Sequence, residues 1–110
     1  MSETRTVNLR AEHIGEDDRY LRAYLDDEGN LHIDGQDLGP GTSIVSTDGE
    51  YEWFYTYAAI NVPRVIVLLG GKPGDDVLDV VGRWTGERSY ELESLLRNSD
   101  IPREQFVWSG

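Results

Sequence analysis

The sequence predicts an α+β fold: an antiparallel sheet of about five or six strands with two or three helices packed on one face. Up to residue 60, short segments alternate between apolar and polar residues and are separated by turn residues, which is typical of strands. Between residues 61 and 100 the apolar residues recur at helical spacing, and residues 105–108 return to a strand pattern. Because the strands come first and the helices later, we expect one sheet with the helices gathered on one side.

The N-terminal segment, residues 1–19, is expected to hold a strand and a partly mobile acidic loop, within a single domain of residues 1–110. Val7, Leu9 and Ala11 alternate with polar residues, so we expect them to share the buried face of this strand. The acidic stretch that follows, residues 15–18, is interpreted as a solvated loop.

Residues 20–25 and 31–33 are predicted to form a hairpin, because two alternating segments flank the turn sequence Asp26–Asn30. Either Gly29 or Asn30 is expected to occupy the left-handed backbone region that this turn requires. In the first arm the leucines and the alanine share one face, and the tyrosines and the arginine share the other.

Residues 36–41 are expected to interrupt the strand pattern before a second hairpin, with arms at 43–47 and 50–58 joined at Asp48-Gly49. The second arm is the most aromatic segment of the chain. In one interpretation its odd-numbered rings form the core face and Phe54 lies opposite, near the tyrosines of the first hairpin. In the other, an amphipathic aromatic surface rimmed by acidic residues is open to solvent. The odd-numbered rings are Tyr51, Trp53, Tyr55 and Tyr57.

Residues 62–69 are predicted to form a helix that Asn61 caps and Gly70-Gly71 ends, with Pro63 in the first turn. The β-branched run at 65–67 also fits a buried strand, and we favour the helix.

Two more helices and a strand are predicted after it. Residues 73–81 place Asp75 and Asp76 at a helix N-terminus, where negative charge is stabilising. Ser89 is expected to cap the next helix, and residues 105–108 to form the last strand.

The composition excludes several classes of function. The chain has 110 residues with 21 acidic side chains, 10 Lys and Arg, and a net charge of −11. Residues 1–60 hold 13 of the acidic and 4 of the basic side chains. This excess argues against binding of DNA, RNA or anionic lipid, which requires cationic side chains. The sequence has no cysteine, which removes disulfides, thiolate nucleophiles and cysteine-ligated metal sites.

No segment has the length and apolarity of a signal peptide or a membrane span, so the expected location is the cytoplasm. No nucleophile, phosphate-loop or dinucleotide motif is complete. His13 and His32 stand outside any triad pattern, and the pair Asp75 and Asp79 is better explained by helix capping than by a metal ion. We therefore expect no metal and no cofactor, and we favour a non-enzymatic function.

The segment Leu21–Pro40 reads LRAYLDDEGNLHIDGQDLGP, and with it the chain resembles short uncharacterised bacterial proteins of actinobacterial type. The resemblance implies no catalytic residue. In size and acidity the chain is also similar to bacterial immunity and antitoxin proteins. The first likeness spans residues 20–110 through further short segments at Tyr51–Trp53, Val62-Pro63, Leu68–Gly71 and Phe106–Trp108.

These observations favour an acidic protein-interaction module, in its most concrete form an immunity-like or antitoxin-like protein that masks a basic partner such as a nuclease. Tyr and Trp beside acidic groups suit a protein interface, because they bury a large area at a small entropic cost. The residues expected to bind the partner are Tyr20, Tyr24, His32, Asp34, Asp37, Glu50, Glu52 and Phe54.

The alternative is a small-ligand-binding or weakly enzymatic domain, with an aromatic pocket between sheet and helices lined by Trp53, Tyr55 and Trp84. A third hypothesis is recognition through apolar surface, with the helix at 62–69 forming a homodimer contact.

Overall fold

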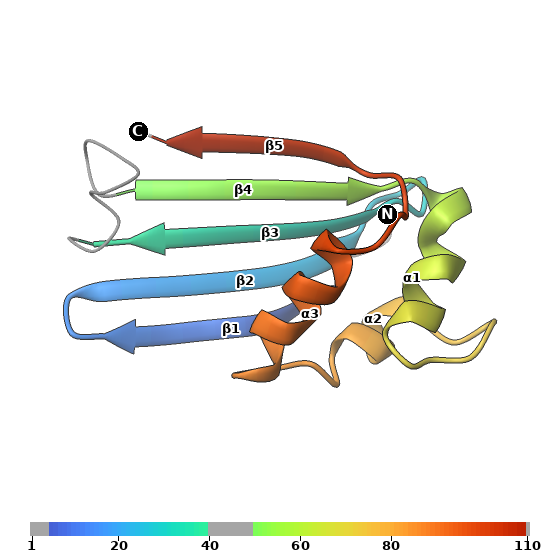
Figure 1. The fold of residues 1–110 in the computed structure, drawn as a ribbon, viewed down its shortest axis with the longest axis horizontal. Helices are drawn as coiled ribbons and strands as arrows, with labels where there is room; N and C mark the ends of the chain where they lie inside the picture. The colour runs from blue at the N-terminus through green and yellow to red at the C-terminus, as the bar shows by residue number, and fades with distance from the viewer. Residues whose placement is uncertain (1–4, 40–49, 110) are drawn as a thin grey trace.

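The computed structural model describes residues 5–39 and 50–109 of the chain. These residues form one antiparallel sheet in which the strands lie side by side in the order of the sequence (Figure 1). The strands are β1 (Thr6–Ile14), β2 (Asp17–Leu25), β3 (Leu31–Leu38), β4 (Glu50–Tyr57) and β5 (Glu104–Ser109).

The helices of the described residues all lie between β4 and β5 in the sequence and pack on one face of the sheet (Figure 1). The predicted α+β class is therefore confirmed, with a five-stranded sheet and three α-helices in the part of the chain that the structure describes. The helical elements are the 3₁₀ turn η2 (Ala59–Asn61), α1 (Val62–Leu68), α2 (Val77–Val81) and α3 (Arg88–Arg97).

The hydrophobic core lies between these helices and the sheet, and β4 contributes the largest side chains to it. Trp53, Tyr55 and Tyr57 are buried, and Phe54 lies on the opposite side of the strand. The first of the two interpretations of the aromatic segment is thus correct. The rest of the core is aliphatic: Leu9, Leu21, Ala23, Leu31, Ile33, Val62, Val65, Ile66, Leu69, Val77, Leu78, Val80, Val81, Leu92, Leu96 and Ile101.

A β-bulge in β1 changes which residues of this strand face the helices. Asn8 pairs with Arg22, but the next pair is Arg10 with Leu21, so Leu9 has no partner in the ladder. Leu9 and Arg10 are both buried, with 1% and 4% of their surface exposed. The predicted alternation is therefore wrong at Ala11, which is exposed because the extra residue reverses the facing of the strand after it.

The side chain that the bulge turns inward, Arg10, anchors α3 to the sheet. Its Nη2 donates to Glu93 Oε1 at 2.6 Å, and its Nε donates to Ser89 Oγ at 2.9 Å. The other Glu93 oxygen, Oε2, accepts a hydrogen bond from Trp53 Nε1 at 2.9 Å. The guanidinium also stacks on the ring of Tyr90, 3.6 Å from its centroid. One buried network therefore joins β1, β4 and α3.

The indole of Trp53 fits into this network because β3 carries a glycine opposite it. A Cβ atom at Gly35 would lie 2.1 Å from the indole ring, which is far inside van der Waals contact. Gly35 pairs with Trp53 across the β3–β4 ladder, so the ring lies over the glycine backbone.

The first predicted hairpin is confirmed and the second is partly wrong. Gly29 takes the left-handed position of the β2–β3 turn, with φ +84°. β3 does not break at Gln36 but continues to Leu38 and pairs with β4 along its whole length. The predicted arm at 43–47 lies outside the described residues.

The predicted loop at residues 15–18 is shorter in the structure. Only Gly15 and Glu16 form the turn between β1 and β2, and Asp17 and Asp18 already belong to β2. Asp18 pairs with His13 in the ladder, so this hairpin is tighter than the acidic composition indicated.

The helices begin and end close to the predicted residues. α1 has Pro63 in its first turn, and Gly70, with φ +89°, follows its end. Asp76 caps α2 by accepting hydrogen bonds from the backbone of Leu78 and Asp79. Ser89 is not the cap of α3 but lies inside its first turn, where its hydroxyl donates to the carbonyl oxygen of Gly86 and accepts from Arg10.

Replacing Arg10 with methionine leaves the Glu93 carboxylate buried without its cation, and we expect the free energy of unfolding to fall by about 3–5 kcal/mol. The double variant Arg10→Met/Glu93→Gln buries no charge, and its amide oxygen still accepts from Trp53. We expect it to be more stable than Arg10→Met alone, as measured by urea unfolding. A double variant as unstable as the single one would show that the ion pair does not anchor α3.

Candidate functional site

The face of the sheet that points away from the helices is not covered by any described element, and we call it the open face. Cross-strand pairs arrange its side chains in rows that run across the sheet. One row is Tyr20, Gln36, Glu52 and Trp108; the next is Arg22, Asp34, Phe54 and Phe106; a third is Tyr24, His32, Thr56 and Glu104.

The structure brings together most of the residues that the sequence predicted to bind a partner. Tyr20, Tyr24, His32, Asp34, Glu50, Glu52 and Phe54 all belong to the open face. Asp37 does not, because it pairs with Arg19 and Tyr51 on the helix side of the sheet. There burial raises the pKa of the Asp37 carboxyl.

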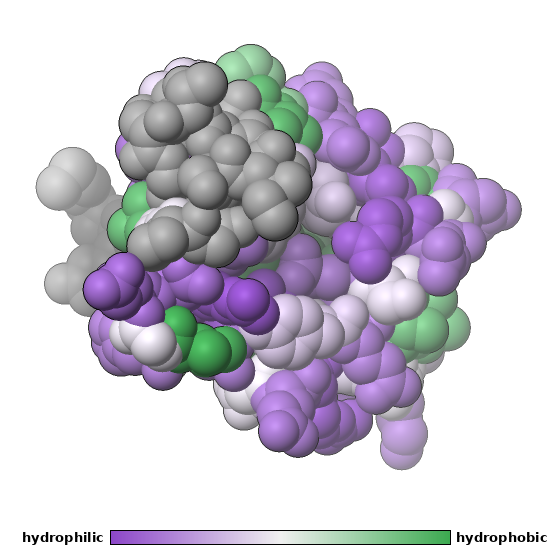
Figure 2. Space-filling view, turned by 60° about the vertical axis from the view of Figure 1, so that its left-hand side comes forward, coloured by the Kyte–Doolittle hydropathy of each residue, from purple (hydrophilic) through white to green (hydrophobic). Residues whose placement is uncertain are grey.

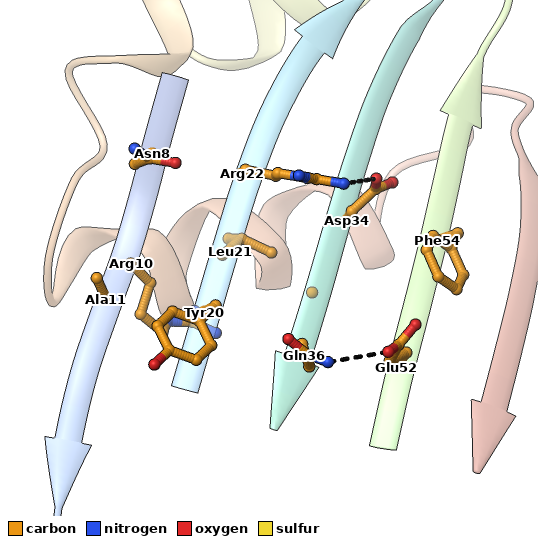
Figure 3. Close-up of a pocket in the computed structure, with 11 residues that line it drawn as sticks. Asn8, Arg10, Ala11, Tyr20, Leu21, Arg22, Asp34, Gln36, Glu52 and Phe54 are labelled. Carbon is orange, nitrogen blue, oxygen red and sulfur yellow. Dashed lines mark hydrogen bonds and ion pairs between the residues drawn. The ribbon is translucent and has the colours of Figure 1, made fainter. Parts of the chain in front are cut away.

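A groove of about 580 Å³ crosses the open face over β1, β2, β3 and β4. Tyr20 stands on one side of it and Phe54 on the other, with Asp34 and Gln36 on the strand between them (Figure 3). Glu52 completes the side on β4 (Figure 3). The groove therefore combines two rings and two carboxylates with Arg10 and Arg22, and its rings and carboxylates suit a cation carried on an apolar stem.

The carboxylates of the groove are only partly neutralised by the protein itself. The Asp34 side chain is 12% exposed, and the Nη2 atom of Arg22 lies 3.5 Å from its Oδ2. Burial raises the pKa of Asp34, and burial together with the neighbouring Glu50 carboxyl raises the pKa of Glu52. Gln36 Nε2 donates to both glutamates and holds them side by side. A cation placed among them would lower these pKa values.

His32 lies at the end of the open face and is fixed by the β2–β3 turn. Its Nε2 lies 2.8 Å from Asp26 Oδ2, its ring stacks on Tyr24 at 4.7 Å, and Thr56 Oγ1 lies 3.3 Å from its Nδ1. Asp26 also accepts hydrogen bonds from Glu28 and Asn30, so its carboxylate organises the turn. The hydrogen bond from His32 is the largest cause that lowers the pKa of Asp26 to about 2.

The rings proposed for a ligand pocket are packed instead against the core. Trp53 and Tyr55 are 8% and 6% exposed. Trp84 Nε1 donates to the Leu69 carbonyl oxygen at 3.2 Å, and the Arg88 guanidinium stacks on the ring, 4.5 Å from its centroid. Of the apolar residues of α1, from the homodimer hypothesis, Val62, Val65 and Ile66 are buried in the core and Val67 is exposed.

The described residues contain no group of three or more metal-ligating side chains. Of the two carboxylates considered as a metal site, Asp79 forms an ion pair with Arg5, and Asp75 accepts a hydrogen bond from the backbone of Lys72.

Among the described residues, no helix is long and apolar enough to span a bilayer. At the end of the sheet where β1 and β2 are joined, the surface is mainly hydrophilic, with small separate apolar patches (Figure 2).

Sequence reasoning missed part of the open face and all of the network behind it. Phe106 and Trp108 belong to the open face, but only the register between β4 and β5 shows this. Arg10 and Glu93 are far apart in sequence, and no local pattern pairs them. The alternation of side chains along a strand was enough to exclude Asp37 from the face that holds Asp34, since residues 34 and 37 of one strand point to opposite sides of the sheet.

A comparison of the chain with protein-family models, curated proteins and solved structures finds no match.

Because the pKa of Asp26 is lowered in the folded state from 3.8 to about 2, its ionised form stabilises the protein above pH 3.8, and this contribution is lost as the pH falls toward 2. In Asp26→Asn we expect lower stability at neutral pH and a smaller decrease between pH 4 and pH 2. Unfolding midpoints measured across this range check both effects. An unchanged acid dependence would mean that Asp26 is not held by His32 and the turn.

Proposed function

We propose that this protein binds a basic protein partner through the open face of its sheet, as an immunity-like or antitoxin-like protein that masks the partner. The observation that carries the proposal is the composition of this face, where ring side chains lie beside partly buried carboxylates. The net charge of the whole chain, −11, has the sign that attracts such a partner.

The rings of the open face supply apolar contact area. Phe106 and Trp108 are 61% and 43% exposed, and Phe106 lies 5.9 Å from Phe54, centroid to centroid. Aromatic side chains are enriched at the centres of protein interfaces, where a few of them provide most of the binding energy. An exposed ring cluster on a sheet that already has a complete core on its other face is better explained by binding than by folding.

The carboxylates supply the preference for a cationic partner. Asp34 and Glu52 have raised pKa values, so each is ionised at a cost that a lysine or arginine in the groove would offset. The same charges accelerate association with a basic surface and repel nucleic acid. The surface is thus suited to compete with an acidic substrate for a basic protein.

Capture from a lysate of the host cell by the full chain tests the proposal, at low salt and at physiological salt. We expect the captured protein to be basic. With the purified pair, we expect the variants Glu52→Lys and Phe54→Ala each to bind this partner at least about ten-fold more weakly than the unchanged protein. Glu91→Lys, an equal change of charge at an exposed position on α3, is the control and should bind normally. The proposal would be contradicted if the two open-face variants bound the partner with unchanged affinity. It would also be contradicted if Glu91→Lys weakened the affinity as much as they do.

A further inference from the structure

The two edges of the sheet are protected to very different degrees. At the β1 edge, the bulge at Leu9 interrupts the ladder, and the Leu9 carbonyl oxygen accepts a hydrogen bond from the backbone of Gly86 at 2.8 Å. Arg5, next to β1, forms ion pairs with Asp76 and Asp79 of the α2 region. A bulge, inward charge and a covering loop are the devices that keep an edge strand from pairing with another chain.

Within β5 itself none of these devices occurs, and the one inward-pointing cation of this edge, Arg103, lies directly before the strand, where it stacks on Tyr55. Its ladder with β4 runs without a bulge, its sequence EQFVWS contains no lysine or proline, and no described strand lies on its outer side. In Figure 1, β5 forms the border of the sheet opposite β1. Its apolar side chains are exposed on both faces: Phe106 and Trp108 on the open face, and Val107, 44% exposed, on the other. Such an edge is a template for an added strand.

We propose that β5 accepts an extended segment of the basic partner as a sixth strand of the sheet. The proposal rests on the proposed function and adds the mode of recognition, in which main-chain hydrogen bonds give affinity and alternate side chains give specificity. On the added strand, the side chains next to Phe106 and Trp108 would be apolar, and the cationic side chains would alternate with them and lie on the opposite face of the sheet.

The net charge and the size of the interface both favour a strand of the basic partner, rather than a second copy of this chain, at the β5 edge. Two copies would each bring a net charge of −11 to the contact. A pair of β5 strands offers six residues a side, whereas a stable interface has roughly 20–30. A partner strand has a larger interface available, because Phe106 pairs with Phe54 and Trp108 with Glu52, so the edge continues into the open face.

The probe for the test is the synthetic peptide acetyl-(Lys-Val)₄-amide, and its control is acetyl-Lys₄-Val₄-amide, which has the same charge without the alternation. We expect the alternating peptide, at millimolar concentration, to slow hydrogen exchange at every second amide of β5 by at least about ten-fold. Protection at alternate residues is the signature of one added strand, because only every second amide points to the outer side.

Val107 provides matched variants, because its side chain points away from the open face. Val107→Lys places a cation on the edge and should abolish the protection, whereas Val107→Thr, which keeps a β-branched side chain, should retain it. The purified partner should likewise bind Val107→Lys at least about ten-fold more weakly than Val107→Thr.

The outcomes separate this inference from the proposed function. If Glu52→Lys weakens binding of the partner and Val107→Lys does not, the proposal of an added strand is wrong and the open-face interface stands. The same conclusion follows if the peptides perturb only residues of the open face. If sedimentation shows that the protein alone is a dimer which Val107→Lys dissociates, the occupant is a second copy and the inference is overturned. A lack of peptide binding at millimolar concentration also contradicts it.

Discussion

The buried ion pair between Arg10 and Glu93 is the constraint on which the arrangement of the molecule depends. A charge in the core is tolerated only with a close partner, so β1 and α3 must meet where these side chains meet. The bulge at Leu9 makes this geometry available by turning two consecutive residues inward. The Trp53 indole then extends the network to β4, over a glycine that leaves room for it.

The consequence of this anchor is an asymmetric protein. With α3 fastened to β1, and α2 linked to it through Arg5, the helices cover one face of the sheet and the α2–α3 segment covers one edge. The other face and the β5 edge are left without a covering element in the described residues, and they adjoin each other at Phe106 and Trp108. Rings and carboxylates therefore occur together on the surface because the core is completed elsewhere.

The open face was largely predictable because strand periodicity is a local property. In β2 and β4 the alternation of residue types separated Tyr20 and Tyr24 from the leucines, and Phe54 from the other rings of its strand, before any pairing was known. The prediction failed at Asp37 because residues 36–41 contain turn-forming types, and pairing with β4 extends β3 through the first of them. Long-range ladder hydrogen bonds and the packing of Trp53 outweighed the local turn preference there.

By itself, the sequence determined the fold class, the excess of negative charge and the starts of α1 and α2, since each depends on neighbouring residues. Only the tertiary structure decided the bulge in β1, the inward position of Arg10, the role of Ser89 and the openness of the β5 edge. These depend on contacts between residues more than seventy positions apart, such as Arg10 with Glu93, or on which strands end at the border of the sheet. No local pattern encodes such pairings, because they are selected by the packing of the whole core.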